Sequence, residues 1–151
     1  MRGRRIGRVA LVVWGALLVG CSSIESPVEN KHEALPQAQT LSDEQDVGPA
    51  GGTLSCGPYT LVVPPAALTT TLHLTMKQVT AGQWPVDLGP HGTQFSQPVS
   101  LMFDAGGEPD PDAMSVYWWN PSTSTWVVQP TTHAGSSCVT TTTHFSRWKL
   151  Q

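Results

Sequence analysis

The residues best suited to covalent chemistry in this 151-residue chain are its three cysteines, because a thiolate is a strong nucleophile and a thiol pair can be oxidised to a disulfide. Cys21 directly follows a long apolar run, whereas Cys56 and Cys138 lie among Thr, Ser and Gly residues. The chemistry open to each thiol therefore depends on the segment that carries it.

Residues 1–20 have the organisation of an export signal. Four arginines and no acidic residue lie in residues 1–8, and residues 9–20 form an apolar run that ends in small residues. About twenty apolar residues are needed to cross a bilayer as a helix, so this run is too short for a membrane span. The segment is predicted to be a signal peptide that is removed from the mature protein.

The end of this segment, Leu18-Val19-Gly20-Cys21, resembles the lipobox of bacterial lipoprotein precursors. The resemblance implies that diacylglycerol is attached to the Cys21 thiol and that the signal is cleaved between Gly20 and Cys21. Two or more acyl chains, such as palmitate, would anchor the protein stably, since each buried CH₂ contributes ~0.8 kcal/mol. The motif thus implies a lipid-anchored protein of the bacterial cell envelope. By resemblance to the sorting rules of double-membrane bacteria, Ser22 after the cysteine implies transport to the outer membrane. An ordinary secretory signal with an incidental cysteine is the alternative.

The mature chain is acidic. From Ser22 onward, four basic residues stand against eleven acidic ones, a net charge of 4 − 11 = −7. Nucleic acid is not an expected partner, because its phosphates attract basic proteins. Residues 21–46 lack aromatic residues and are rich in Glu, Ser and Gln, so we expect the lipidated cysteine to be followed by a flexible acidic tether. A peptide docking motif is the alternative interpretation of the tether.

Residues 47–151 predict an all-β domain. Short runs rich in Thr, Val and aromatic residues alternate with Gly- and Pro-rich turns, and no long helical period is present. The expected strands are 53–55, 59–63, 70–79, 97–103, 114–119, 125–129 and 137–145, the last with a continuation to Leu150 as an alternative. About seven short strands in about a hundred residues are typical of an antiparallel β-sandwich.

The segment 48–68, GPAGGTLSCGPYTLVVPPAAL, is similar to the opening of a ZU-five domain, the module shared by zonula occludens proteins, ankyrins and netrin receptors. The similarity continues in the same order through 92–101, 117–119 and 143–146, and covers about residues 47–150. It implies a β-sandwich for protein interaction and scaffolding, with no bound cofactor. The partner would be a protein or an envelope polymer.

The same resemblance raises a second possibility at His144, Phe145 and Ser146. In some animal members of the family, this tripeptide cleaves itself between the Phe and the Ser. The Ser146 hydroxyl would attack the Phe145 carbonyl, with His144 accepting the proton. The favoured alternative is that His144 and Phe145 only alternate between the faces of a terminal strand.

Cys56 and Cys138 remain as an even pair in an oxidising compartment, so we expect a disulfide between them. The bridge would close a loop of 82 residues (138 − 56) and stabilise the domain by ~4–5 kcal/mol in the chain-entropy model. It requires Cα atoms within about 7 Å. Two free thiols are the alternative.

Residues 114–119 predict an exposed aromatic ledge. Alternation along a strand would put one set of side chains in the core and Tyr117 and Trp119 on the outside, joined by Trp126 or Trp84. Such a ledge could stack on sugar rings of an envelope polysaccharide or anchor a protein partner. The alternative is that these side chains only cover a second sheet face.

No metal site is expected. Four carboxylates share one Gly- and Pro-rich loop but lack the EF-hand spacing, and the histidines lack metal-ligand spacing. The loop acids are Asp104, Glu108, Asp110 and Asp112. The chain also has no nucleophile elbow, phosphate-binding loop or H-E-x-x-H motif, so catalysis is not expected.

Overall fold

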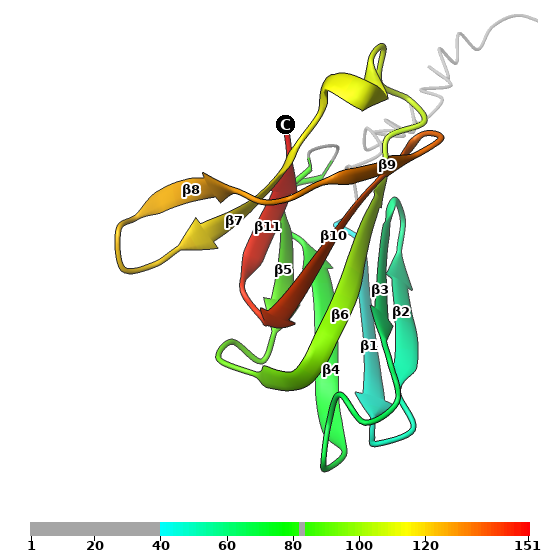
Figure 1. Ribbon diagram of the computed structural model, residues 1–151, viewed down its shortest axis with the longest axis vertical. Coiled ribbons are helices and arrows are strands. Elements are labelled where there is room, and N and C mark those ends of the chain that lie inside the picture. The colour runs from blue at the N-terminus through cyan, green and yellow to red at the C-terminus, as the bar shows by residue number, and fades with distance from the viewer. Residues whose placement is uncertain (1–39, 82–83) are drawn as a thin grey trace, which may run out of the picture. The chain divides into compact units, whose positions relative to one another are not determined.

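The computed structural model describes residues 40–81 and 84–151, so the signal segment, the lipobox and most of the expected tether lie outside the described residues. Nearly all regular structure in the described part is β-strand (Figure 1). The elements are β1 (Ser42–Val47), β2 (Gly52–Cys56), β3 (Tyr59–Val63), β4 (Leu72–Gln78), β5 (Val86–Gly89), β6 (Gln94–Asp104), the 3-10 turn η1 (Pro111–Ala113), β7 (Val116–Asn120), β8 (Thr125–Val128), β9 (Thr132–Ala134), β10 (Ser137–His144) and β11 (Arg147–Leu150). Within these residues, no helix has the length and apolar character that a bilayer crossing requires.

The strands form two antiparallel sheets. One has the order β1-β4-β5-β11-β7-β8 and the other the order β2-β3-β6-β10-β9. The prediction of an all-β antiparallel sandwich is confirmed. The strands outnumber the expected seven, because β5 and β9 are too short to show alternation, β1 is polar, and the last expected strand is divided into β10 and β11.

Strand β1 corrects the expected boundary between tether and domain. The polar, acidic composition of residues 42–46 predicts a tether. In the structure they belong to a strand that pairs with β4, from Ser42 opposite Lys77 to Val47 opposite Leu72. Val47 is the buried residue of β1, and the rest of the strand lies along the sheet edge. Charged side chains are common on edge strands, because they discourage pairing with other chains. The folded domain therefore includes residues 42–46.

The core lies between the inner faces of the two sheets. In the five-stranded sheet, Leu61 stands opposite Leu54 and Leu101, and all three side chains are fully buried. In the six-stranded sheet, Trp148 of β11 is the largest buried side chain. Burying each such side chain contributes about 1.5–3 kcal/mol, so these alternating positions supply much of the folding free energy.

Cys56 and Cys138 do not form the expected disulfide; both are free and buried. They lie on one cross-strand row, with Cys56 opposite Tyr59, Tyr59 opposite Phe103, and Phe103 opposite Cys138. Neighbouring strands are about 4.8 Å apart, so three spacings separate the two Cα atoms by about 14 Å, twice the limit for a disulfide. Burial raises the pKa of both thiols, which keeps them protonated.

Candidate functional site

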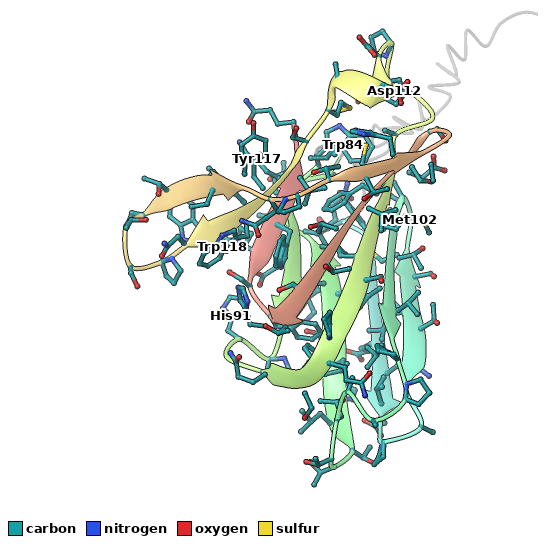
Figure 2. The ribbon with its side chains drawn as sticks, viewed as in Figure 1. Trp84, His91, Met102, Asp112, Tyr117 and Trp118 are labelled. Atoms are coloured by element: carbon teal, nitrogen blue, oxygen red, sulfur yellow. The ribbon has the colours of Figure 1, made fainter. Side chains whose placement is uncertain are left out.

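Strand β7 presents two different faces. Val116 is fully buried and Trp118 packs against the core, whereas Tyr117 and Trp119 are partly exposed on the outer face of the six-stranded sheet. Figure 2 labels Tyr117 and Trp118, which are successive residues and point to opposite sides of the strand. The expected alternation is confirmed, and the β7–β8 hairpin that carries it projects from the side of the sandwich (Figure 1).

The aromatic ledge is formed by Tyr117, Trp119 and Trp126. Trp126 of β8 stands opposite Trp119, with ring centroids 5.4 Å apart and an interplanar angle of 66°. Lys149 of β11 stands opposite Tyr117, and its Nζ lies 5.4 Å from the Tyr117 ring centroid and 4.9 Å from that of Trp126. Both distances lie within the ~6 Å range of cation–π contacts. Lys149 therefore places a positive charge on the ledge.

Trp84 does not belong to the ledge. Its ring meets Tyr59 edge-on, with centroids 6.5 Å apart, and it packs against the core. Its Nε1 donates a hydrogen bond of 3.0 Å to Glu108 Oε1. The Trp84 indole therefore packs against the core and links it to the acidic loop through this hydrogen bond.

A pocket of about 180 Å³ adjoins the ledge at Trp119. It is lined by His91, Trp119, Pro121, Ser146 and Arg147. Beside it, Asp87 Oδ1 lies 2.9 Å from His91 Nε2 and 3.6 Å from Arg147 Nε. The pocket thus offers an aromatic surface on one side and a set of hydrogen-bonding, charged groups on the other.

All lysine and arginine side chains of residues 40–81 and 84–151 belong to the face that carries the ledge. Lys77 follows a buried Met and precedes a buried Gln in β4, so it points outward; Arg147 and Lys149 alternate with the buried Trp148 and Leu150. In the register of the sheet, Asp87 stands between Lys77 and Arg147. The face therefore combines aromatic rings with cations in an otherwise acidic domain.

The acids at the far edge of this face are engaged by a histidine. His73 Nδ1 lies 2.8 Å from Asp46 Oδ1, and His73 Nε2 lies 3.7 Å from Glu44 Oε2. The hydrogen bond to Asp46 raises the pKa of His73. These groups belong to β1 and β4, on the opposite side of β5 and β11 from the ledge.

The tripeptide expected as a self-cleavage site links β10 to β11. Phe145 is buried against Phe95, with ring centroids 4.9 Å apart. The Ser146 hydroxyl donates a hydrogen bond of 3.0 Å to the Trp119 carbonyl. His144 Nδ1 lies 3.2 Å from Thr142 Oγ1. The serine hydroxyl and the imidazole therefore have separate partners.

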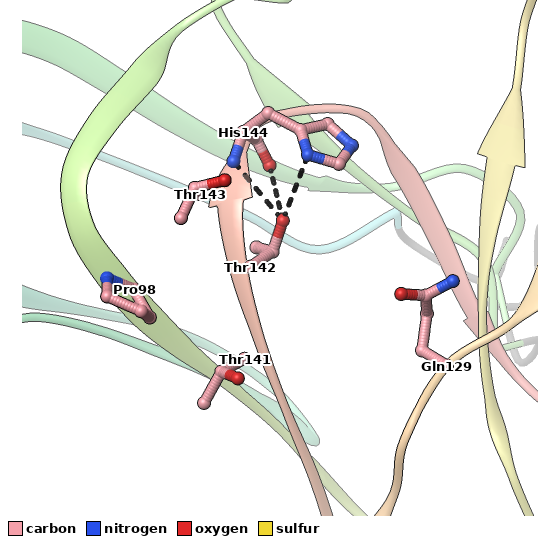
Figure 3. Close-up of a pocket in the computed structure, with 6 residues that line it drawn as sticks. All are labelled: Pro98, Gln129, Thr141, Thr142, Thr143 and His144. Atoms are coloured by element: carbon pink, nitrogen blue, oxygen red, sulfur yellow. Dashed lines mark hydrogen bonds between the residues drawn. The ribbon is translucent and has the colours of Figure 1, made fainter.

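His144 also lines a second pocket, of about 240 Å³ (Figure 3). The Thr142 hydroxyl donates to the His144 carbonyl and accepts from the His144 backbone N–H, so it is best satisfied with the ring proton on Nδ1. Nε2 is then an acceptor that is buried without a hydrogen-bond partner in the described structure. The Trp148 Nε1–H, a donor, is likewise buried without a partner there. Burial lowers the pKa of His144, so the ring stays neutral.

The acidic loop begins at Asp104, whose carboxylate is hydrogen-bonded by neighbouring protein groups. Asp104 Oδ1 accepts hydrogen bonds from Gly106 N at 3.0 Å and from Ser136 Oγ at 2.9 Å. Among the residues that the structure describes, no three or more His, Cys, Asp or Glu side chains are grouped so as to hold a metal ion. Asp110 and Asp112 flank Pro111 at the start of η1.

The fold and this face together define an all-β sandwich with an open, aromatic and cationic outer surface. Comparisons with protein-family models and with curated proteins find no match to this sequence. Sequence reasoning located the ledge but missed Lys149, Arg147, His91 and Asp87, because their places beside it depend on the pairing of β11 with β5 and β7. The alternation of RWKL in β11 was the signal that could have found two of them.

Proposed function

We propose that this protein is a lipid-anchored protein of the bacterial cell envelope whose β-sandwich is a non-catalytic binding module. The anchor is proposed from the sequence motif Leu18-Val19-Gly20-Cys21, which lies outside the described residues. The module is proposed from one observation: Tyr117, Trp119 and Trp126 gather with Lys149 on an outer sheet face. The ZU-five resemblance, proposed on sequence alone, supports an interaction role.

The physical support is that large aromatic rings are on the outside of a domain that already has a core. Scattered apolar side chains are normal on a surface, whereas a contiguous apolar patch marks an interaction site. Val128, which is 56% exposed, stands opposite Tyr117 and extends the patch. Tyr and Trp are also the residues that most often dominate binding energy.

Cell fractionation tests the anchor. Wild-type protein should sediment with the membranes, and Cys21→Ser should be found in the soluble fraction, because without a thiol no acyl chain is attached. Sedimentation and normal processing of the serine variant would contradict the anchor.

Photo-crosslinking of the full-length protein in its own cells tests the module. Trp119→Ala should lose the wild-type crosslinks. Val62→Ala should retain them, because Val62 is 43% exposed on the other sheet. Equal crosslinking by both variants would sink the assignment of the binding face to the ledge.

Self-cleavage between Phe145 and Ser146 is the less supported alternative. The Ser146 hydroxyl donates to the Trp119 carbonyl, and His144 pairs with Thr142. A base must reach the proton that it accepts. The intact mass of the denatured protein decides: loss of the peptide 146–151 would establish cleavage, and the full mass would exclude it.

A further inference from the structure

We infer that the ligand of the aromatic ledge is an anionic polysaccharide. One of its sugar rings stacks on Trp119, and a carboxylate of the polysaccharide pairs with Lys149 or Arg147. This inference rests on the proposed function, because it names the ligand class of the same face. It is carried by three features that coincide there: aromatic planes, a lysine without an acidic partner among the described residues, and a small polar pocket.

The aromatic planes suit the apolar C–H faces of sugar rings. Trp119 and Trp126 meet at 66° rather than lying parallel, so they present surfaces in two directions along the hairpin. A pyranose ring has apolar C–H groups on its faces and hydroxyl groups around its edge. It can therefore bury area against an indole while its hydroxyls remain bonded to water or to protein.

The charge of the face suits an anion. Within residues 40–81 and 84–151, three Lys and Arg side chains stand against eight acidic ones, yet all three cations are on this face. No carboxylate of the described residues lies within ion-pair distance of Lys149, whose ammonium donates to Gln151 and lies over two rings. A partly exposed cation left without an acidic partner in an acidic domain is complementary to a negatively charged ligand.

The pocket beside Trp119 supplies directional contacts. His91, Arg147 and the adjoining Asp87 together provide hydrogen-bond donors and acceptors. At about 180 Å³ the pocket has room for one sugar residue or a charged side group next to the stacked ring. Asp87 also fixes the Arg147 and His91 side chains, so part of the ordering cost is met before the ligand binds.

The alternatives of nucleic acid and anionic membrane are less favoured by the same charges. Both need an extended basic surface, since each phosphate contact adds a separate cation. Here Arg147 and Lys149 are the cations next to the ledge, and Lys77 is two strands away from β11. A polymer with spaced carboxylates and apolar ring faces matches this sparse pattern better than a dense polyanion.

Isothermal titration of the full-length protein in detergent tests the inference, with polygalacturonate as the charged probe and dextran as the neutral one. Polygalacturonate should bind and dextran should bind at least about tenfold more weakly. Trp119→Ala and Lys149→Gln should each weaken polygalacturonate binding about tenfold, the loss typical of a hot-spot residue. Lys77→Gln is the matched control, because it removes the same charge two strands away, and its effect should be less than about twofold.

Three outcomes would overturn the inference. Equal losses for Lys77→Gln and Lys149→Gln would show general electrostatic attraction, and equal binding of dextran would remove the anionic requirement. If neither polymer binds while a protein still crosslinks through Trp119, the ligand class is wrong and the proposed binding module stands. Thermal unfolding of each variant should match the wild type. Lys149→Gln keeps the test valid if Trp119→Ala misfolds, because Lys149 is partly exposed and alternates with the buried Trp148 and Leu150.

Discussion

His144 shows how one buried side chain can set a pH dependence. Its ring contacts the rings of both Trp118 and Trp148, with centroid distances of 5.0 and 5.9 Å, and its Nε2 is buried without a partner in the described structure. Protonation would place a charge in these surroundings, so burial lowers the pKa of His144 in the folded protein. The unfolded chain then binds the proton more readily than the folded one.

The sign of the effect follows from this difference. Near pH 7.5 both states hold a neutral His144, and as the pH falls through about 6.5 the unfolded state gains a proton that the folded state resists. The free energy of unfolding should therefore decrease between pH 7.5 and 5.5. His144→Phe keeps an aromatic ring and should reduce that decrease, as measured by urea unfolding at the two pH values.

His73 provides the control of opposite sign. The hydrogen bond to Asp46 raises the pKa of His73, so its stabilising contribution is full below about pH 6.5 and is lost as the pH rises through its folded pKa. His73→Gln should therefore make the loss of stability at low pH steeper.

The His144 prediction fails if the free energy of unfolding of His144→Phe has the same pH profile as that of the wild type. Burial of the His144 imidazole would then have no energetic consequence.

At the scale of the strand, β1 illustrates what composition misses. Residues 42–46 are polar, and the decisive residue is Val47, which is 1% exposed and pairs with Leu72. Val47→Ala should lower the free energy of unfolding by about 1–3 kcal/mol, because two buried methyl groups are removed and a cavity remains. Urea unfolding of the full-length protein measures this change.

Val62→Ala is the matched control, since the same substitution is made at a side chain that is 43% exposed. Its effect should stay within about 0.5 kcal/mol. Equal and small effects at both valines would mean that β1 adds nothing to the stability of the fold. The folded domain would then begin at residue 47, as the sequence predicts.

The strands that alternation identifies are those with one buried face. Alternating polar and apolar residues predict β4 and β7, and the same pattern predicts the outward position of Tyr117 and Trp119. β5 and β9 are four and three residues long, too short for a period of two to be recognised. Local pattern therefore predicts faces well where a strand is long enough.

Register is the information that local pattern lacks. Cys56 and Cys138 were expected to bond because both lie in the folded domain of an exported chain, yet two intervening strands separate them in one sheet. Lys149 reaches the ledge by the same kind of non-local pairing, through β11 and β7. Both the failed disulfide and the missed cation depend on which strands become neighbours.

At the scale of the whole molecule, the last strand that the structure describes, β11, joins the two parts of the six-stranded sheet. β11 lies between β5 and β7, with Trp148 opposite both Val86 and Trp118. Without β11 the sheet would divide into β1-β4-β5 and β7-β8, and the aromatic ledge would lose its support. Cooperative folding of this domain should therefore depend on its C-terminal residues.

Trp148 measures that dependence directly. It is 1% exposed, and Trp148→Ala should cost about 3–5 kcal/mol, a large part of the 5–15 kcal/mol typical of a domain. Deletion of residues 147–151 removes Trp148, Leu150 and the backbone pairing together, so the truncated chain should show no cooperative urea transition by near-ultraviolet circular dichroism. Gln151→Ala is the control, because its side chain is exposed and the strand is kept. A truncated protein that unfolds with the wild-type midpoint would mean that β11 is dispensable and that the sandwich is completed before the chain reaches it.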